Sequence, residues 1–217
     1  PFELTTFRAD CGIKDGRHPQ SVSFVRDIVS DLSRRDFTVN AMAWSPEKGL
    51  VDPFGGREDI TKRLIRCVGE PSLRFEEDAL RILRSLRFMS RLGFRLDDET
   101  AKALRQNAFR LKTISRERIF SELSGIICGK NACDTVTEYA DVISVALPEL
   151  FAGGAFMLKR LPDELHLRFA ALFKNADDAE NGMFSLKSPR KLRERVVALR
   201  RLIPLPDDEK EILILGI

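Results

Sequence analysis

The chain has 217 residues, of which 43% are hydrophobic and 32% charged, and its formal net charge is +3. This length allows two small domains, each with a hydrophobic core. No stretch approaches the roughly 20 consecutive apolar residues of a membrane-spanning helix, so the sequence predicts no such helix. A net charge this small does not by itself indicate a nucleic-acid-binding protein.

Four cysteines, Cys11, Cys67, Cys128 and Cys133, are scattered along the chain. Cys128 and Cys133 could form a metal-binding pair, but no histidine or second cysteine pair accompanies them. We therefore expect buried free thiols in a reducing cytosol, and hence a cytoplasmic protein.

Two short strands are predicted near the N-terminus. Residues 3–8 (ELTTFR) are rich in Thr and Phe, and residues 21–25 (SVSFV) alternate between apolar and polar positions. Residues 9–20 between them contain Gly, Asp and Pro, which is typical of a mobile loop. We expect a hairpin with a long connection, which is unusual unless it is functional or disordered.

Short elements follow the predicted hairpin. Residues 34–44 (RRDFTVNAMAW) predict a short helix, and residues 45–49 (SPEKG) a turn. Residues 57–64 (REDITKRL) predict a second short helix, and residues 65–69 (IRCVG) a short strand or turn. The composition then shifts near residue 70 from Thr, Gly and Pro to Leu, Arg and Glu, which indicates a domain boundary.

Residues 50–56 (LVDPFGG) place Asp, Pro and two glycines in a tight reversal. We expect an architectural role, with the glycines supplying positive φ angles. Asp52 is expected to bond the turn at Gly55 and Gly56 rather than to touch a substrate.

Residues 74–92 (RFEEDALRILRSLRFMSRL) predict one long amphipathic helix, because apolar residues recur there at steps of three and four. Asp78, Arg81, Arg84 and Arg87 step by three along another side. On a helix they form a slanted row roughly 13 Å long, the scale of a nucleotide from base edge to triphosphate. The acid next to an arginine could hydrogen-bond a base, and the other two arginines could hold phosphates.

The alternative interpretation of this row is a solvated helix face with ion pairs between neighbouring turns. Three arginines on one helix destabilise it unless an anion or carboxylates compensate their charge. From Arg57 to Arg118 there are 16 Lys or Arg against 10 Asp or Glu. This local excess favours a phosphate-bearing partner, although a generally basic surface would give the same count.

Beyond residue 92 the sequence predicts only helices. Asp97 and Ser115 are candidate caps, Arg118 and Glu122 a candidate ion pair, and Ser188 precedes a proline in a cap-then-N1 pattern. The expected helices cover residues 96–108, 115–127, 132–147, 163–174, 188–202 and 207–215.

Five motifs, ELTTFR, RRDFTVNAMA, DPFGG, EDALRILRSLRF and SRERIFSEL, follow one another within residues 1–127. In this order they resemble the bacterial class II tRNA nucleotidyltransferase and poly(A) polymerase family. The resemblance implies an α+β fold, with part of a polymerase-beta-like palm carrying a small antiparallel sheet, followed by helical neck and body domains. We place the palm at residues 1–69, the neck at 70–130 and the body at 131–217.

Members of this family transfer CMP or AMP from CTP or ATP to an RNA 3′ end and use magnesium. The resemblance therefore implies addition of C, of A or of both to tRNA 3′ ends with a protein template, and the tRNA 3′ end, CTP and ATP as partners. A bacterial poly(A) polymerase is an alternative within the family. A non-catalytic RNA-binding helical module is an alternative of another class.

The resemblance also assigns site residues. Asp78 and Arg81 serve in the family as a protein template for the base. Cytosine and adenine both present an amine beside a ring nitrogen, which suit a carboxylate acceptor and a guanidinium donor. Uracil or guanine would set a carbonyl against the carboxylate. The expected nucleotide-binding residues are Arg35, Asp36, Asn40, Asp78, Arg81, Arg84 and Arg87.

Two of the assigned segments carry open alternatives. Asn40 either bonds near the triphosphate or caps its own helix. Arg8 and the loop at residues 9–20 either reorder when nucleotide or RNA binds, or are simply disordered. We also expect Asp78 and Arg81 to face a cleft between the strand-rich and helical parts.

One departure from the family concerns catalysis. The family's glycine-rich phosphate turn and D-x-D metal pair are not present, and the opening PFELTTF is typical of the middle of a domain. Glu3 matches the family's third carboxylate, which is catalytic and binds metal. One carboxylate cannot hold two metal ions for phosphoryl transfer, so we expect this chain alone to be inactive.

Overall fold

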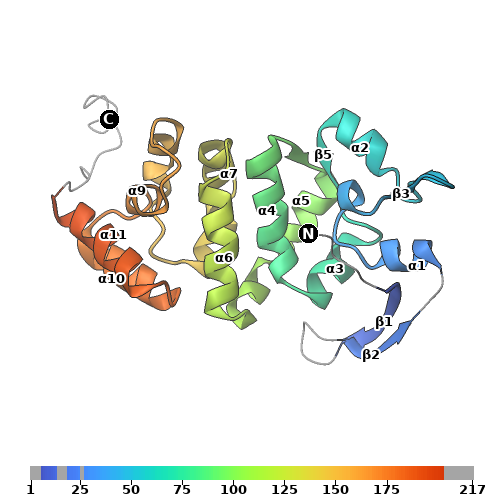
Figure 1. The fold of residues 1–217 in the computed structure, drawn as a ribbon. Coiled ribbons are helices and arrows are strands. Elements are labelled where there is room, and N and C mark those ends of the chain that lie inside the picture. The colour runs from blue at the N-terminus through green and yellow to red at the C-terminus, as the bar shows by residue number, and fades with distance from the viewer. Residues whose placement is uncertain (1–5, 14–18, 25–26, 203–217) are drawn as a thin grey trace. The chain divides into compact units, whose positions relative to one another are not determined.

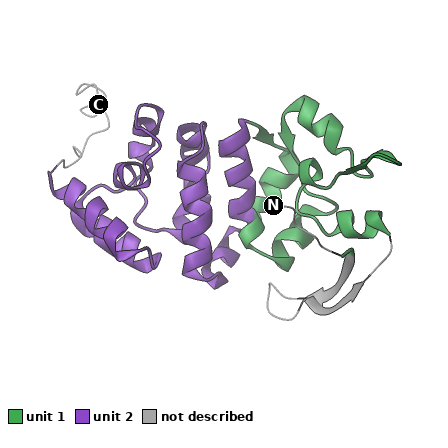
Figure 2. Cartoon of the chain, in the orientation of Figure 1, with its two compact units in different colours: residues 1–81, 94–107 green, residues 82–93, 108–217 purple. Residues whose placement is uncertain are grey.

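The computed structural model describes residues 6–13, 19–24 and 27–202, which form short helices and three two-stranded sheets (Figure 1). This confirms the predicted α+β class. The chain divides into two compact units, residues 1–81 with 94–107 and residues 82–93 with 108–217 (Figure 2). These units reflect packing, and the domain boundaries that we placed after residues 69 and 130 stay a prediction.

The first unit begins with an antiparallel hairpin of β1 (Arg8–Ile13) and β2 (Pro19–Phe24), in which Arg8 pairs with Phe24. A hairpin was predicted here, but the loop at residues 9–20 was drawn too long. Residues 9–13 and 19–20 belong to the strands, because backbone pairing between the strands outweighs the turn-like composition. Residues 14–18 and the first five residues of the chain lie outside the described part.

Helix α1 (Ile28–Ser33) was not predicted. Asp27 caps it, since its carboxylate accepts hydrogen bonds from the backbone N–H groups of Val29 (3.2 Å) and Ser30 (2.9 Å). This is the usual role of an aspartate at a helix start.

The helix predicted over residues 34–44 is only a 3₁₀ turn, η1 (Thr38–Asn40). A longer helix cannot form, because the backbone here pairs with another segment. Phe37 pairs with Cys67 in a β-bridge, and the N–H of Thr38 donates to the backbone carbonyl of Arg66 at 2.9 Å. The chain then enters the antiparallel pair β3 (Ala43–Ser45) and β4 (Gly49–Val51), with the predicted turn between them.

Helix α2 (Gly56–Lys62) confirms the second short helix. The Asp52 carboxylate accepts from the N–H groups of Gly56 (2.7 Å) and Arg57 (2.9 Å), so it caps the turn as predicted, although its second partner is Arg57 and not Gly55. Gly55 has a φ of +75°, as expected. Gly56 is required for space instead, since a Cβ there would lie 2.9 Å from the sulfur of Met42.

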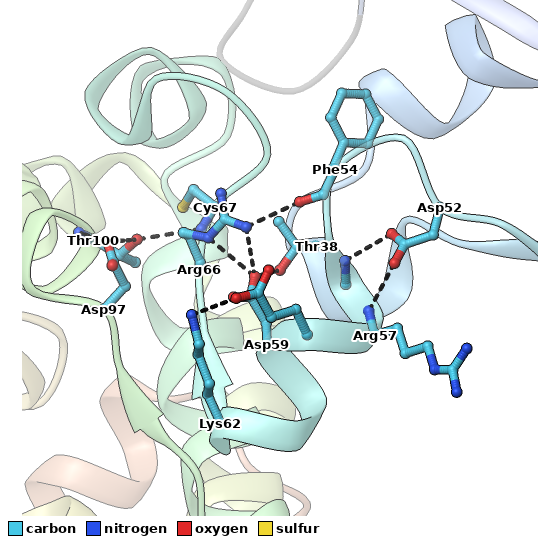
Figure 3. A network of polar contacts seen from close by, with 12 residues as sticks. Thr38, Asp52, Phe54, Arg57, Asp59, Lys62, Arg66, Cys67, Asp97 and Thr100 are labelled. Carbon is cyan, nitrogen blue, oxygen red and sulfur yellow. Dashed lines mark hydrogen bonds and ion pairs between the residues drawn. The ribbon is translucent and has the colours of Figure 1, made fainter.

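A buried carboxylate network braces this part of the first unit (Figure 3). Asp59 accepts hydrogen bonds from the Thr38 hydroxyl and from Arg66 Nε, the latter at 3.0 Å. Arg66 also donates to the carbonyl of Phe54 at 2.9 Å. The network therefore ties the DPFGG turn, η1 and α2 to the chain segment at Arg66.

The strand β5 (Leu64–Ile65) pairs in parallel with β6 (Arg95–Leu96). Helix α5 (Asp98–Asn107) follows, and Asp97 caps it as predicted by accepting from the N–H of Thr100 at 3.2 Å. The Thr100 hydroxyl accepts in turn from the N–H of Cys67 at 3.2 Å. These bonds attach the segment of residues 94–107 to the first unit.

The single long helix predicted over residues 74–92 is wrong. The structure has α3 (Pro71–Glu77) and α4 (Leu80–Leu92), with a break at Asp78. Asp78 has extended backbone angles (φ −149°, ψ 103°), and its carboxylate accepts from the N–H of Leu80 at 3.0 Å. The aspartate thus ends one helix and caps the next, a competition between side chain and backbone that is common for this residue.

The second unit contains only helices among its described residues. The helix predicted over 132–147 is broken at buried Tyr139, and the helix at 176–185 was missed. Residues 207–215 lie outside the described part. The elements after α5 are η2 (Ala108–Thr113), α6 (Arg116–Ile127), α7 (Ala132–Glu138), α8 (Ala140–Ala146), η3 (Ala152–Lys159), α9 (Leu165–Ala171), α10 (Ala176–Ser185) and α11 (Arg190–Leu202).

The two predicted serine caps of this unit differ from expectation. Ser115 occupies the cap position of α6, but its side chain makes no capping hydrogen bond. Ser188 does not cap α11, because its hydroxyl donates to the carbonyl of Met183 at 2.8 Å and so closes the end of α10.

Helices α4 and α6 approach each other closely through small residues. The Ser90 hydroxyl donates to the carbonyl of Ile126 at 2.6 Å. A Cβ at Gly129 would overlap Ser90 Oγ, and a Cβ at Gly125 would lie 2.5 Å from Arg87 Cδ. Both glycines are therefore needed for the backbones to meet at this distance. Among the described residues no helix is long and apolar enough to cross a membrane.

Candidate nucleotide-binding site

The predicted site residues fall in both compact units. Glu3 lies outside the described residues, and Arg8 lies in β1, where the side chains are not described. Arg35, Asp36, Asn40, Asp78 and Arg81 belong to the first unit, and Arg84 and Arg87 to the second.

The end of α1 carries two arginines held by one carboxylate. Asp31 is buried, and its Oδ1 accepts from Arg34 Nε (3.0 Å) and Nη2 (2.6 Å). Its Oδ2 accepts from Arg35 Nη2 at 3.3 Å. The Arg35 side chain remains 43% exposed. Asp31 therefore orients Arg35 and leaves much of its guanidinium open to an anion.

Asp36 and Asn40 form a compact pair around η1. Asp36 is buried, and its Oδ1 accepts from Asn40 Nδ2 at 2.7 Å. The N–H of Phe37 donates to both side chains, at 3.2 Å in each case. Asn40 thus caps its own short helix, which is one of the two alternatives for this residue. Its contact with the triphosphate stays a prediction.

Asp78 and Arg81 lie at the start of α4, both half-buried. Arg81 Nη1 donates to Glu77 Oε2 and to the carbonyl of Arg74 (3.1 Å). Its Nη2 donates to the carbonyl of Arg34 at 3.4 Å. Glu77 also accepts from Arg74 Nη1 at 2.8 Å. Arg81 is therefore fixed by Glu77 and by two backbone carbonyls.

The helix break changes the geometry of the predicted row. Asp78 has extended backbone angles, so it does not continue the helical spacing of the arginines. Arg81, Arg84 and Arg87 still share α4, and their row spans about 9 Å at 1.5 Å per residue. The arginines therefore form one row, and the aspartate is placed separately by its own capping bond.

Arg87, in the second unit, is held by a residue from another helix. Its Nε lies 2.9 Å from Glu122 Oε2 of α6, and Glu122 is buried. Gly125 has no side chain, and this leaves space for the aliphatic part of the Arg87 side chain to pack against α6. Glu122 thus compensates an arginine of α4, and its predicted pairing with Arg118 stays a prediction.

Sequence reasoning missed the three carboxylates that hold these arginines, Asp31, Glu77 and Glu122. Asp31 and Glu77 had a readable signal, because each stands three or four residues from its arginines. Glu122 had none, since its pairing with Arg87 depends on two distant helices. Carboxylates thus lie against two of the three arginines of the row, Arg81 and Arg87.

The described residues contain no group of three or more His, Cys, Asp or Glu that could hold a metal ion. Cys67, Cys128 and Cys133 are free thiols, and burial raises the pKa of Cys67 to about 12 and that of Cys128 to about 11. The thiols of Cys67 and Cys128 are therefore protonated at neutral pH.

Two family descriptions match the chain. Residues 1–66 match "Poly A polymerase head domain", and residues 93–150 match "Probable RNA and SrmB- binding site of polymerase A". Together they cover more than half of the sequence. The chain belongs to the class II family of CCA-adding enzymes and poly(A) polymerases.

Similar proteins in this family are CCA-adding enzymes. That of Geobacillus thermodenitrificans is 46% identical over 157 residues, which are 72% of this chain and 39% of the relative. That of Limosilactobacillus reuteri is 36% identical over 215 residues, 94% of this chain and 52% of the relative. The chain thus spans about half the length, or less, of the curated relatives that it matches.

Solved structures agree with this assignment. The CCA-adding enzyme of Bacillus stearothermophilus in complex with CTP matches 91% of this chain and 50% of its own, with 34% identity and a TM-score of 0.77. The Thermotoga maritima CCA-adding enzyme complexed with tRNA_CCA matches 80% of this chain and 48% of its own, with 26% identity and a TM-score of 0.63.

Proposed function

We propose that this chain belongs to a tRNA nucleotidyltransferase that adds C and A to tRNA 3′ ends from CTP and ATP. The observation that carries the proposal is the similarity of 91% of the chain to an enzyme solved in complex with CTP. The free thiols are consistent with a cytoplasmic location, which we propose as well.

Asp78 and Arg81 are proposed to select the base. Asp78 would accept the exocyclic amine of cytosine or adenine, and Arg81 would donate to the adjacent ring nitrogen. The hydrogen bonds that fix Arg81 support this role, because a donor held in place discriminates better than a mobile one. Uracil and guanine would present a carbonyl to Asp78, at a cost of about 1–3 kcal/mol for the unpaired group.

The remaining arginines are proposed to hold the triphosphate. Arg35 is oriented by Asp31 while remaining partly exposed, which suits an anion-binding side chain. Arg84 and Arg87 extend the row along α4. Asp36 and Asn40 are proposed to complete the nucleotide site from η1.

Magnesium is proposed as the cofactor because the family uses it for phosphoryl transfer. Glu3 is the residue of this chain that would bind it and act in catalysis. We also propose that this chain alone has no transferase activity, because one carboxylate cannot hold two metal ions for phosphoryl transfer. CTP incorporation into a tRNA 3′ end by the purified chain would refute that proposal.

Calorimetric titration of the chain with CTP, ATP and UTP tests the function directly. Selective binding of CTP and ATP over UTP is expected. Both family descriptions mention polymerase A, which favours a poly(A) polymerase as the second candidate. That candidate would bind ATP in preference to CTP. A non-catalytic RNA-binding module would bind RNA of any sequence and none of the nucleotides.

A further inference from the structure

Arg74 of α3 donates hydrogen bonds from all three nitrogens of its guanidinium to the protein itself. Nε donates to the carbonyl of Val68, Nη2 to that of Ser33 and Nη1 to Glu77 Oε2, each at 2.8 Å. The side chain is 19% exposed. The guanidinium of Arg74 is therefore fixed in the first unit by acceptors on three sides, and its contacts are those of a connecting residue.

Two of these acceptors stand next to proposed nucleotide-binding residues. Ser33 is the last residue of α1 and lies two positions before Arg35. Glu77 is the last residue of α3 and lies directly before Asp78. Arg74 and Ser33 are 41 residues apart in the sequence. One side chain therefore joins two distant segments that both carry residues of the candidate site.

Arg81 is held by the same residues. Its Nη1 donates to Glu77 Oε2, the oxygen that also accepts from Arg74, and to the carbonyl of Arg74 at 3.1 Å. One hydrogen of Nη2 donates to the carbonyl of Arg34 at 3.4 Å. Among the described residues no acceptor binds Nε, so this N–H and the second Nη2 hydrogen are left for a ligand. We call these two hydrogens the donor edge of Arg81.

A single carboxylate lies between the two arginines. Glu77 is 33% exposed, whereas the side chains of Arg74 and Arg81 are 19% and 17% exposed. With Arg81 as its only partner, the flexible Glu77 side chain could follow that guanidinium into other positions. The bond from Arg74, which is itself anchored on two backbone carbonyls, gives Glu77 one position and so gives Arg81 a fixed acceptor.

We propose that Arg74 is a positioning residue for base selection, because it fixes Glu77 and thereby the direction of the donor edge of Arg81. The proposal rests on the proposed function, in which Arg81 donates to the ring nitrogen of cytosine or adenine. Arg74 does not touch the base in this account. A donor with a fixed direction discriminates between bases, whereas a donor that can turn also reaches a carbonyl of uracil.

Arg74→Lys tests the assignment. The variant keeps the positive charge, but one ammonium cannot reproduce the planar fork that reaches three acceptors. In calorimetric titrations of the chain with CTP and UTP, the ratio of the two affinities should fall about tenfold, the lower end of what one charged hydrogen bond contributes. The affinity for UTP should change little. An unchanged ratio in a variant with the wild-type melting temperature would overturn the proposal.

Arg66→Lys is the matched control. Arg66 also connects segments of the first unit, since its guanidinium donates to Asp59 and to the carbonyl of Phe54 (Figure 3). Neither acceptor is a partner of Arg81. The variant should therefore lose stability but keep the wild-type ratio of CTP to UTP affinity. An equal fall of the ratio in both Arg→Lys variants would mean a general loosening of the unit, and the positioning role would be wrong.

Glu77→Gln provides a second test if Arg74→Lys does not fold. It removes the carboxylate between the two arginines and leaves the bonds of Arg74 to Ser33 and Val68 in place. The ratio of CTP to UTP affinity should again fall about tenfold. The double variant should show no further fall, because both changes remove the same support of Arg81. A wild-type ratio in Glu77→Gln would contradict the proposal.

The position of Arg81 can also be measured without a nucleotide. In the ¹⁵N-labelled chain, its hydrogen-bonded Nη protons should exchange slowly with water, and this NMR signal should be lost in Arg74→Lys and kept in Arg66→Lys. Selective CTP binding with an unchanged ratio and signal in Arg74→Lys defeats only the positioning role. Loss of the signal in Arg74→Lys, with no CTP selectivity in the wild type, defeats the proposed function and leaves Arg74 as the residue that positions Arg81.

Discussion

The predicted nucleotide-binding arginines of the two units are held by carboxylates in different ways. In the first unit, Asp31 and Glu77 lie three or four residues from the arginines that they hold. In the second unit, Arg87 is held by Glu122 from another helix. The local pairs require only that a short stretch of chain folds, because each carboxylate lies within four residues of its arginines. The distant pair also requires that α4 and α6 pack closely, so it depends on the fold of the whole unit.

The largest loss of stability is expected when α4 is separated from α6. Gly129→Ala places a Cβ against Ser90 Oγ and the Ser90 backbone, which cannot move without displacing α4. We expect the free energy of unfolding to fall by about 3 kcal/mol, measured by urea denaturation. Ser121→Ala, at an exposed position of α6, is the control and should change stability by less than about 0.5 kcal/mol. Equal stability of the two variants would show that the helices are not in close contact.

Removing the distant carboxylate is the next largest change. Glu122→Gln keeps the side-chain volume but takes the negative charge away from Arg87. We expect a loss of about 2 kcal/mol, because a partly buried arginine is left without its ion-pair partner. Thermal and urea unfolding measure the loss. Wild-type stability would mean that the pair contributes nothing to the fold.

Removing a local carboxylate should cost less. Asp31→Asn weakens the bonds to Arg34 and Arg35, but both side chains reach solvent and can be hydrated. The expected loss of stability is about 1.5 kcal/mol, together with weaker CTP binding because Arg35 is no longer oriented. A larger loss of stability in Asp31→Asn than in Glu122→Gln would contradict the expected difference between local and distant pairs.

The smallest effect is expected at the exposed cap of α1. The hydrogen bond from the Ser30 side chain, with those from the Ser30 and Val29 backbone, lowers the pKa of Asp27. A lowered folded-state pKa stabilises the fold at pH values above the ordinary aspartate value of about 3.9, and this contribution is lost as the pH falls further. The difference in melting temperature between wild type and Asp27→Asn should therefore shrink below about pH 4. A difference that grows on acidification would contradict the assigned cap.

Elements with a local cause could be predicted from the sequence. Asp52 and Asp97 cap the helices that follow them because their side chains reach N–H groups only a few residues away. The hairpin was also recognised, although its strand limits were wrong. Pairing between strands decided those limits, and composition does not report it.

The break at Asp78 could not be predicted, because Phe75, Ala79 and Ile82 keep the helical period across it. The break depends on a carboxylate that bonds the N–H of Leu80 in place of a continuous helix. The pairing of Arg87 with Glu122 could not be predicted either, because it depends on the packing of α6 against α4. Gly125 makes room for the Arg87 side chain there, and nothing in the local sequence indicates this contact. Distant packing thus determines what local spacing leaves open.

We propose that Asp78 recognises the base and that Arg87 binds phosphate. Titration of Asp78→Ala and Arg87→Ala with CTP, ATP, UTP and GTP tests it most directly, with melting temperatures measured in parallel because Asp78 also caps α4. A lost charged hydrogen bond costs about 1.5–3 kcal/mol, so Asp78→Ala should weaken CTP and ATP roughly ten- to hundredfold. The affinity of Asp78→Ala for UTP and GTP should change little. Arg87→Ala should instead weaken the binding of all four nucleotides by a similar factor. An equal loss for all four nucleotides in Asp78→Ala would contradict the account.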